Sequence, residues 1–329
     1  MREKKSVHDK EYALSEVIGF ILLLGIIVAA FALWMIYIVP VNGREAEIAQ
    51  MNFVKDRFTD YKTSLDSLWV NSPYGASWGQ DGVTLSTSIN LGTGGGNTQA
   101  GGLFLPMMNP VGSSATLSVS DNGDNMNISS IGPGDATVQY NQYNMTILQY
   151  QSMNNYWIQQ TYYYQDGGVF LTQLNGSVCR VAPPISFVNN TNTYSVTITP
   201  ITLNGVASIG GNGPVRVDTR LKTLTAPVLS TEYWVNTSVT VTNYTAARMW
   251  LDMFNSTRRN GGITVTSVAK PCYKFGISSP AAVPGVAFMN ITGPAGTCSP
   301  DEQTTPDVNL MIQPVSYDVT LNSIVSNLN

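Results

Sequence analysis

The sequence predicts an α+β protein in which a long N-terminal helix, first hydrophobic and then amphipathic, precedes a mainly antiparallel, β-sandwich-like domain. Two observations support this prediction. The first is a run of 23 residues without a charge, Val17 to Val39. The second is the alternation of apolar and polar residues from about Pro73 onward, in segments rich in Val, Thr, Ile and Tyr. We place the three parts at residues 14–40, 41–70 and 71–329.

The apolar run is long enough to span a membrane. At a rise of about 1.5 Å per residue, its helix would measure roughly 34 Å, which exceeds the hydrocarbon thickness of a bilayer. Four basic residues lie within the first ten positions, which favours a cytoplasmic N-terminus and places the chain from about Val41 onward outside. Trp34 and Tyr37, near the outer end, suit an interfacial aromatic belt.

A cleaved secretory signal is the alternative for this run. Ala30 and Ala32 form an Ala-x-Ala pattern, but seven apolar residues, Leu33 to Val39, follow it. The run is therefore too long for the apolar region of such a signal. We expect a retained transmembrane helix.

Heptad spacing follows the apolar run, after an interruption expected at Pro40 and Gly43. The apolar residues that recur every seven positions are Met51, Phe58, Leu65, Val54, Tyr61 and Leu68. Charged residues are expected on the other faces, at Glu47, Lys55, Asp56, Arg57, Asp60, Lys62 and Asp66. The apolar stripe either docks on the β domain or packs against copies of the chain.

The remainder reads as an antiparallel sandwich or two small stacked sheets. The segments that predict strands are residues 82–91, 114–120, 136–150, 192–203, 215–225, 238–245, 261–269 and 316–324. One helix is expected from Thr245, because Met249, Trp250, Met253 and Phe254 share a helical face. We expect it to cover an open end of the sheet.

Composition indicates that the β domain is exported. Residues 1–66 hold 17 of the 38 charged side chains, so the following 263 residues are poor in charge. Eight Asn-x-Ser/Thr sequons all follow the apolar run, and we take them as glycosylation candidates: Asn127, Asn144, Asn175, Asn189, Asn236, Asn243, Asn255 and Asn290. An Asn- and Thr-rich composition also produces such triplets by chance.

The three cysteines lie in the same part of the chain, and their spacing fits no zinc or haem motif. Cys272 and Cys298 bracket a Gly- and Pro-rich stretch and are the first candidates for a disulfide, which leaves Cys179 buried and free. Other pairings stay open.

The sequence argues against an enzyme. The only histidine is His8, so the exported part lacks the usual general base, and we predict no metal and no cofactor. A glycosidase with two carboxylates needs no histidine, but nothing in the sequence pairs the acids. The charge distribution shows no basic patch, so no nucleic-acid partner is expected.

Three polar or aromatic stretches allow both a structural and a binding interpretation. Residues 92–102 are Gly-rich and read as a flexible turn, since a phosphate loop would need a lysine and a following helix. Asp121 and Asp124 fit a tight turn better than a calcium loop. The run Tyr162 to Tyr164, with Trp157, could form a sugar platform, although strand alternation places part of it in the core.

Glu16 stands directly in front of the apolar run. A helix N-terminus carries about half a positive charge and unpaired N–H groups, so an acid in the first turn is favoured there. Ser15 is suited to the N-cap position of such a helix. This interpretation requires no partner.

The residues at this point also resemble the N-terminus of archaeal type IV pilins and archaellins. The match consists of Ser15, Glu16, Val17, Ile18 and Gly19, with Glu16 where many relatives have proline. In that family a prepilin-type peptidase removes a short leader, and the apolar helix remains as membrane anchor and assembly element.

The resemblance implies a leader of residues 1–13, cut between Ala13 and Leu14. It also implies that the helix packs against copies of the chain or other pilin-like subunits, with Glu16 paired to the new α-amine of a neighbour. Small residues such as Gly19 let helices approach closely.

The middle of the chain resembles uncharacterised archaeal surface proteins with pilin-like anchors. The residues that carry this second match are Asp166, Gly167, Gly168, Gln173, Pro183, Pro184, Gly205, Ser208, Gly210 and Gly213. They are scaffold motifs and imply no activity.

Two functions follow from these resemblances. The first is a pilin-like structural subunit of an archaeal cell-surface filament. The second is a singly anchored extracellular glycoprotein or minor pseudopilin, whose β domain binds a surface glycan or envelope ligand. The expected location is the cell membrane with the C-terminal domain outside, or an extracellular filament.

Overall fold

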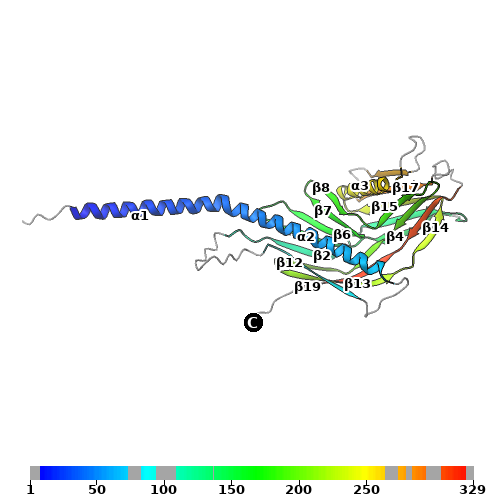
Figure 1. Ribbon diagram of the computed structural model, residues 1–329, viewed down its shortest axis with the longest axis horizontal. Coiled ribbons are helices and arrows are strands. Elements are labelled where there is room, and N and C mark those ends of the chain that lie inside the picture. Colours follow the sequence, from blue (N-terminus) through cyan, green and yellow to red (C-terminus); the bar gives the residue numbers. More distant parts are fainter. Residues whose placement is uncertain are drawn as a thin grey trace, which may run out of the picture.

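The computed structural model describes residues 8–72, 83–93, 109–135, 137–263, 273–278, 284–293 and 305–323, with side chains from residue 17 onward. A long helix leads into a β-rich body, and its first half projects away from that body (Figure 1). The α+β class and the order of the parts are as predicted.

The N-terminal helix is continuous from His8 to Val70. It consists of α1 (His8–Leu33), a π-helical segment η1 (Trp34–Ile38) and α2 (Val39–Val70). The predicted interruption at Pro40 and Gly43 is therefore wrong. Pro40 has no N–H group, and the π-helical segment just before it absorbs the misfit, with the Val39 N–H bonded to the Trp34 carbonyl. The helix bends in this region without breaking (Figure 1).

The start of the helix also differs from the expectation. Because α1 begins at His8, Ser15 and Glu16 lie inside it and not at its first turn. Ser15 is therefore not the N-cap of the helix in the full chain. The residues from His8 to Ala13 contain neither proline nor glycine, so nothing ends the helix ahead of Ser15.

The described strands form four sheets of mostly antiparallel strands. Sheet A has the order β1 (Thr84–Asn90), β13 (Pro214–Leu224), β19 (Val315–Ser323) and β11 (Ile201–Asn204). Sheet D has the order β14 (Val228–Glu232), β18 (Val308–Ile312), β10 (Tyr194–Ile198) and β9 (Ile185–Asn189). The pairs β10–β18 and β11–β19 are parallel.

The other two sheets are larger. Sheet B has the order β12 (Ala207–Gly211), β2 (Ser114–Ser120), β5 (Ile147–Met153), β6 (Gln160–Gln165), β7 (Gly168–Gln173) and β8 (Gly176–Val181). Sheet C has the order β16 (Tyr273–Ile277), β17 (Gly285–Thr292), β15 (Trp234–Val241), β3 (Asn125–Ile131) and β4 (Gln139–Asn144). The four sheets form a propeller-like ring and not clearly the predicted sandwich.

Proline residues explain why sheets A and D are separate. The chain passes from one to the other at Pro200, Pro227 and Pro314, and a proline cannot donate a ladder hydrogen bond. Adjacent backbone bonds persist across the junction, such as Val315 N–H to the Pro200 carbonyl at 2.9 Å. The two sheets are therefore halves of one bent surface. The predicted single strand 192–203 is divided here, and 136–150 is likewise divided between β4 and β5.

Sheet B separates two hydrophobic cores. The side chains of Tyr163 and Phe170 point into a core shared with sheets C and D. Their neighbours Tyr162, Tyr164 and Leu171 point into a second core shared with sheet A and α2. This alternation is the period of two that a strand imposes.

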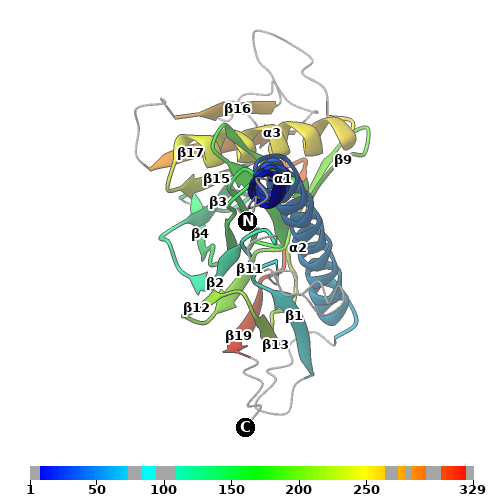
Figure 2. The same ribbon diagram turned by 90° about the vertical axis from the view of Figure 1, so that its left-hand side faces the viewer.

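The helix α3 (Tyr244–Asn260) covers the first core (Figure 2). The side chain of Asn243 caps it by accepting a hydrogen bond from the Ala246 N–H at 2.8 Å. Met249, Trp250, Met253 and Phe254 are buried, as their predicted common face requires. Of the predicted strand 261–269, residues 264–269 lie outside the described residues.

Several residues of the second resemblance meet where sheet D bends into sheet A. Asp166 and Gly167 form the two-residue turn between β6 and β7, both with positive φ, and Pro184 packs against Gly167. The Asp166 carboxylate accepts a hydrogen bond from the Ile201 N–H, directly after Pro200, at 2.9 Å. These residues hold the scaffold together, which agrees with their interpretation as structural motifs.

Candidate membrane and assembly segment

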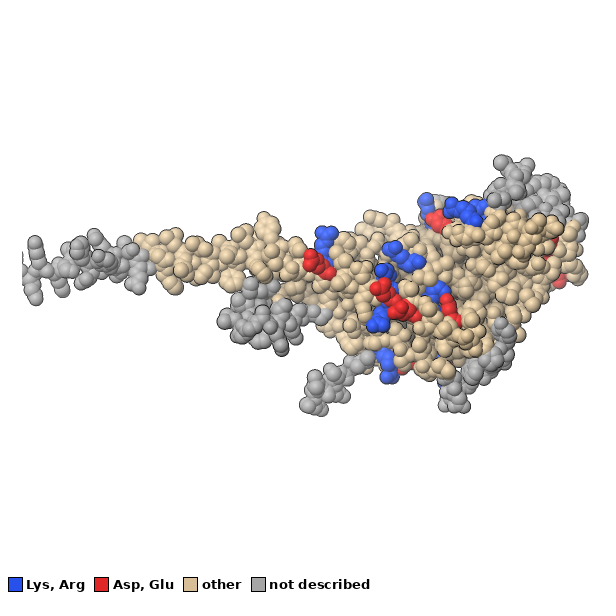
Figure 3. Space-filling model, viewed as in Figure 1, with Lys and Arg blue, Asp and Glu red and all other residues tan. Residues whose placement is uncertain are grey.

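The first half of the long helix exposes apolar side chains on every side. All residues from Val17 to Ile38 are exposed, and seventeen of them are large hydrophobic residues. Within the part of the chain that the structure describes, this is the one helix long and apolar enough to cross a membrane. We call Val17–Ile38 the rod. In Figure 3 it is free of Lys, Arg, Asp and Glu up to the body.

Burial of a large apolar side chain is worth about 1.5–3 kcal/mol, so the rod in water would be strongly unfavourable. Lipid chains or other apolar helices must cover it. A helix satisfies its own backbone hydrogen bonds, which makes it suited to hydrocarbon surroundings. The rod is thus an element for membrane anchoring or secretion.

The second half of the helix is docked on the body. Val54, Phe58, Tyr61 and Leu65 are each at most 1% exposed and belong to the core between sheets A and B. Of the two uses considered for the heptad stripe, the structure has the docked one.

Polar contacts fix the direction of this docked half. The Tyr61 hydroxyl shares a hydrogen bond of 2.8 Å with the Thr219 hydroxyl on β13. The Tyr317 hydroxyl of β19 donates to the Leu65 carbonyl at 2.7 Å. Burial raises the pKa of both phenols, so both hydroxyls remain protonated.

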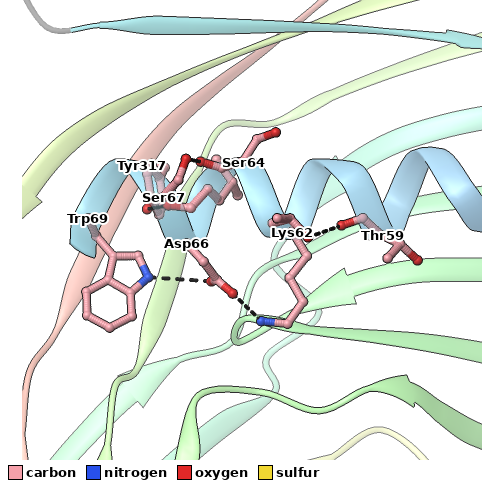
Figure 4. Close-up of polar contacts among 9 residues, drawn as sticks. Thr59, Lys62, Ser64, Asp66, Ser67, Trp69 and Tyr317 are labelled. Atoms are coloured by element: carbon pink, nitrogen blue, oxygen red, sulfur yellow. Dashed lines mark hydrogen bonds and ion pairs between the residues drawn. The ribbon is translucent and has the colours of Figure 1, made fainter. Parts of the chain in front are cut away.

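Two charged residues predicted to face solvent are buried instead. Glu47 is 1% exposed, and Lys62 is 7% exposed. Lys62 pairs with Asp66 one turn later, at 2.5 Å (Figure 4). Glu47 was missed although its spacing of seven from Val54 places it on the buried stripe. Because a buried charge is costly without a partner, a charged residue on the buried stripe indicates hydrogen-bond donors or an opposite charge inside the protein.

The partner of Glu47 is the loop between β5 and β6. The Glu47 carboxylate accepts hydrogen bonds from the backbone N–H groups of Asn155 at 2.6 Å and Tyr156 at 2.8 Å. The Tyr156 ring packs on Gly43, in the space that a Cβ atom would occupy. Gly43 therefore permits close contact between helix and loop, where the prediction expected a break.

Next to this contact, the Arg44 guanidinium lies over the Trp157 ring, 4.4 Å from its centre. The rod is thus connected to the body through a defined neck, built by α2 and the β5–β6 loop.

The processing and assembly residues of the prediction lie at the beginning of the helix. Ala13, Leu14, Ser15, Glu16 and Gly19 all belong to α1. Gly19 and Gly25 have open space around the position of a Cβ atom. Cleavage and pairing of Glu16 remain predictions.

None of the sequon asparagines is buried. Asn144, Asn175, Asn189 and Asn243 are exposed, and Asn127, Asn236, Asn255 and Asn290 are half-buried. Four of them also accept a hydrogen bond through Oδ1, namely Asn189, Asn243, Asn255 and Asn290; for example, Asn243 caps α3, and Asn255 accepts from Arg258 at 2.8 Å. A glycan is carried on Nδ2, so these contacts do not oppose modification.

Cys179 is a free cysteine on β8, as predicted, but it is half-buried rather than fully buried. Burial raises the pKa of its thiol to about 11, against a smaller lowering by Lys62. It is therefore a poor nucleophile at neutral pH. The disulfide candidates Cys272 and Cys298 lie outside the described residues.

The structure does not favour the alternative binding sites. Tyr162, Tyr163 and Tyr164 are at most 7% exposed, so they cannot form a sugar platform.

Asp121 accepts from the Gly123 N–H at 2.9 Å, which is the predicted tight turn. Asp124 accepts from Gln165 and from the Thr242 N–H. Among the described side chains, no three His, Cys, Asp or Glu residues gather as a metal site. Most of the Gly-rich stretch 92–102 lies outside the described residues.

Asp166 is a fully buried carboxyl group with a strongly raised pKa. Burial raises its pKa to about 8, partly offset by the hydrogen bond from the Ile201 N–H. Its second oxygen, Oδ2, has no hydrogen-bond partner. Asp166 lies at the junction of sheets rather than in a cleft, so we assign it to the scaffold.

Comparison with family models, with curated proteins and with solved structures finds no match for this chain.

Proposed function

We propose that this protein is a pilin-like structural subunit of an archaeal cell-surface filament, with no catalytic role. The observation that supports this best is the uncovered apolar rod, which continues without a break into a helix docked on a folded body (Figure 1). A rod of this kind can be held by lipid before assembly and by the rods of other copies afterwards.

The start of the helix supplies the assembly chemistry in this proposal. A prepilin-type peptidase removes residues 1–13, which leaves a new α-amine on Leu14. Glu16 would then be the one acid in front of 27 uncharged residues, Val17 to Gly43. An unpaired carboxylate costs several kcal/mol among apolar helices, so a neighbour's α-amine is its natural partner.

The alternative is a singly anchored extracellular glycoprotein or minor pseudopilin. The observation that favours it is length, because the rod alone is long enough to cross a bilayer and needs no other copy. In this case the β body would serve adhesion to a surface glycan or to the cell envelope.

Mass spectrometry of the mature N-terminus and electron microscopy of sheared surface material test the proposal together. We expect a free amine on Leu14 and filaments that contain the chain. An intact Met1 and no filaments would overturn the proposal in favour of the anchored protein. A processed chain without filaments also supports the alternative, because processing alone does not require assembly.

A pair of variants tests the role of Glu16. We expect Glu16→Gln to be processed and inserted in the membrane but to lose filaments, because a neutral amide cannot form the ion pair. Glu45→Gln changes an exposed acid on the same helix and should keep filaments. Filaments of normal yield from Glu16→Gln would contradict this role.

A further inference from the structure

One end of sheet B gathers exposed apolar side chains. The register of β2, β5, β6, β7 and β8 brings the segment before β2, the β5–β6 loop and the β7–β8 turn to the same end of the sheet. These three connections and the end of β5 carry the exposed or half-buried residues Val111, Met153, Trp157, Ile158 and Leu174. We call these five residues the neck surface.

The neck surface brings several exposed apolar side chains to one end of the body. Leu174 is 99% exposed and Val111 is 68% exposed. The connections are held in place nevertheless: the Val111 N–H donates to the Tyr156 hydroxyl at 3.1 Å, and the Asn154 side chain donates to the Ile158 carbonyl at 2.8 Å. The apolar residues are therefore presented by a fixed framework.

The part of the neck surface formed by the β5–β6 loop lies beside the helix just after the end of the rod. The uncharged apolar run ends at Val39, and Gly43, which touches Tyr156, follows about 6 Å further along the helix. The headgroup layer on each side of a bilayer is several ångströms thick. Tyr156, and Trp157 over Arg44, thus lie at the depth at which Trp, Tyr and Arg are enriched in membrane proteins.

We propose that the neck surface rests on the outer face of the lipid bilayer, so that the body is seated on the membrane and does not hang free from the rod. This inference rests on the membrane-anchored state of the proposed function, and it holds for a filament subunit before assembly and for a single anchor alike.

The favoured partner is lipid and not a second copy of the chain. The surface is made of loop residues next to the end of a membrane-spanning helix, and its large apolar side chains stand beside an aromatic–arginine pair. That composition is typical of residues at a membrane interface. Val41, 53% exposed, extends the exposed apolar side chains of the rod to two residues before Gly43, which contacts the β5–β6 loop.

The test uses the full chain labelled with 5-fluorotryptophan in phosphatidylcholine nanodiscs. Spin labels are carried either on the choline headgroup or on the acyl chain, and ¹⁹F signals are assigned with Trp34→Phe, Trp157→Phe and Trp69→Phe. We expect both labels to reduce the signal of Trp34, which lies near the outer end of the rod, and the headgroup label to reduce the Trp157 signal. Trp69, at the far end of α2, should keep its intensity with both labels.

The outcomes separate this inference from membrane anchoring itself. A reduced Trp34 signal with an unchanged Trp157 signal would overturn the seated body and leave the anchor intact. Loss of neither signal would overturn both. If the Trp157 signal is unaffected by both lipid labels but changes with protein concentration, the neck surface binds a second copy of the chain. This result would also overturn the proposal.

Surface variants provide the matched control. Leu174→Asp and Ile158→Asp change exposed residues, so the body should fold, but the Trp157 signal should recover its intensity while Trp34 stays reduced. Leu229→Asp, at a position 74% exposed on β14, should change neither signal. Asn175 shares the turn with Leu174, so we also expect its sequon to be empty in membrane-bound chains. A glycan at Asn175 in those chains would contradict the proposal.

Discussion

The two halves of the N-terminal helix have the same backbone but opposite surroundings. In the rod, apolar residues occupy every face, and all of them are exposed. In α2, apolar residues recur in heptads, and the stripe is buried on the body. The difference shows that the distribution of apolar residues around a helix determines what covers it. A helix with one apolar stripe docks on its own domain, whereas a helix that is apolar on every face needs lipid or a partner to cover it.

The neck between the halves shows how this difference is maintained. Pro40 and the π-helical segment mark the change, and Glu47, Gly43 and Arg44 hold the first docked turns to the β5–β6 loop. Because these contacts begin five residues after the end of the rod, about one and a half turns further along the helix, the direction of the rod is set by the body. The following predictions test whether the two halves are as independent as this comparison indicates.

The largest effect is expected in the docked half. Phe58 is fully buried beside Tyr162, so Phe58→Ala should leave a cavity and lower the free energy of unfolding by about 3–5 kcal/mol. Urea denaturation of the detergent-solubilised full chain, followed by near-ultraviolet circular dichroism, measures this loss.

The matched change in the rod is Phe31→Ala. Phe31 is 41% exposed and touches no part of either core, so the same measurement should show an unchanged unfolding midpoint of the body. An equal loss in both variants would refute the independence of the two halves.

An effect of intermediate size is expected from pH, which should change the stability of the body through Asp166. The pKa of Asp166 is about 8 in the folded chain and about 3.9 when unfolded. Between these values the folded chain holds a proton that the unfolded chain has lost, so the contribution of Asp166 to stability falls as pH rises from about 4 to about 8.

Asp166→Asn should remove this loss, since an amide stays neutral and asparagine tolerates positive φ. We expect the variant to be more stable than the parent at pH 9, by roughly 1–3 kcal/mol, with a smaller difference at pH 5. Urea midpoints at the two pH values check this. A variant that is less stable than the parent at pH 9 would contradict the prediction.

The smallest effect is expected at the neck. Glu47→Gln replaces one of two accepting oxygens by an amide nitrogen, so one backbone N–H of the β5–β6 loop loses its partner. The expected cost is about 1–2 kcal/mol. Hydrogen exchange at Asn155 and Tyr156 should accelerate, while Glu45→Gln leaves it unchanged. Unchanged exchange in Glu47→Gln would mean that Gly43 and Tyr156 hold the neck alone.

Much of the architecture could be predicted because it depends on local periodicity. The docked stripe, the amphipathic α3 and strands such as β2 and β13 follow directly from their spacing. The arrangement of the strands could not be predicted, since Pro200, Pro227 and Pro314 act together only after their strands have paired. The ring of sheets depends on those long-range contacts.

The candidate site likewise has one part that could be predicted from the sequence and one part that could not. The rod was evident from composition alone. The buried Glu47 and the role of Gly43 were missed, because their partner is a loop more than a hundred positions away. Spacing placed Glu47 on the buried stripe, but no local rule identifies the N–H groups that satisfy it.

By itself the sequence determined where the helix is apolar, where it becomes amphipathic and which later segments alternate, because hydrophobic periodicity is a property of neighbouring residues. Only the tertiary structure decided that the helix runs through Pro40 unbroken, that three prolines bend one surface into sheets A and D, and that apolar loops surround the neck. The last two features depend on contacts between distant segments, which form only when the chain is folded, and the first depends on a local π-helical adjustment that spacing does not reveal.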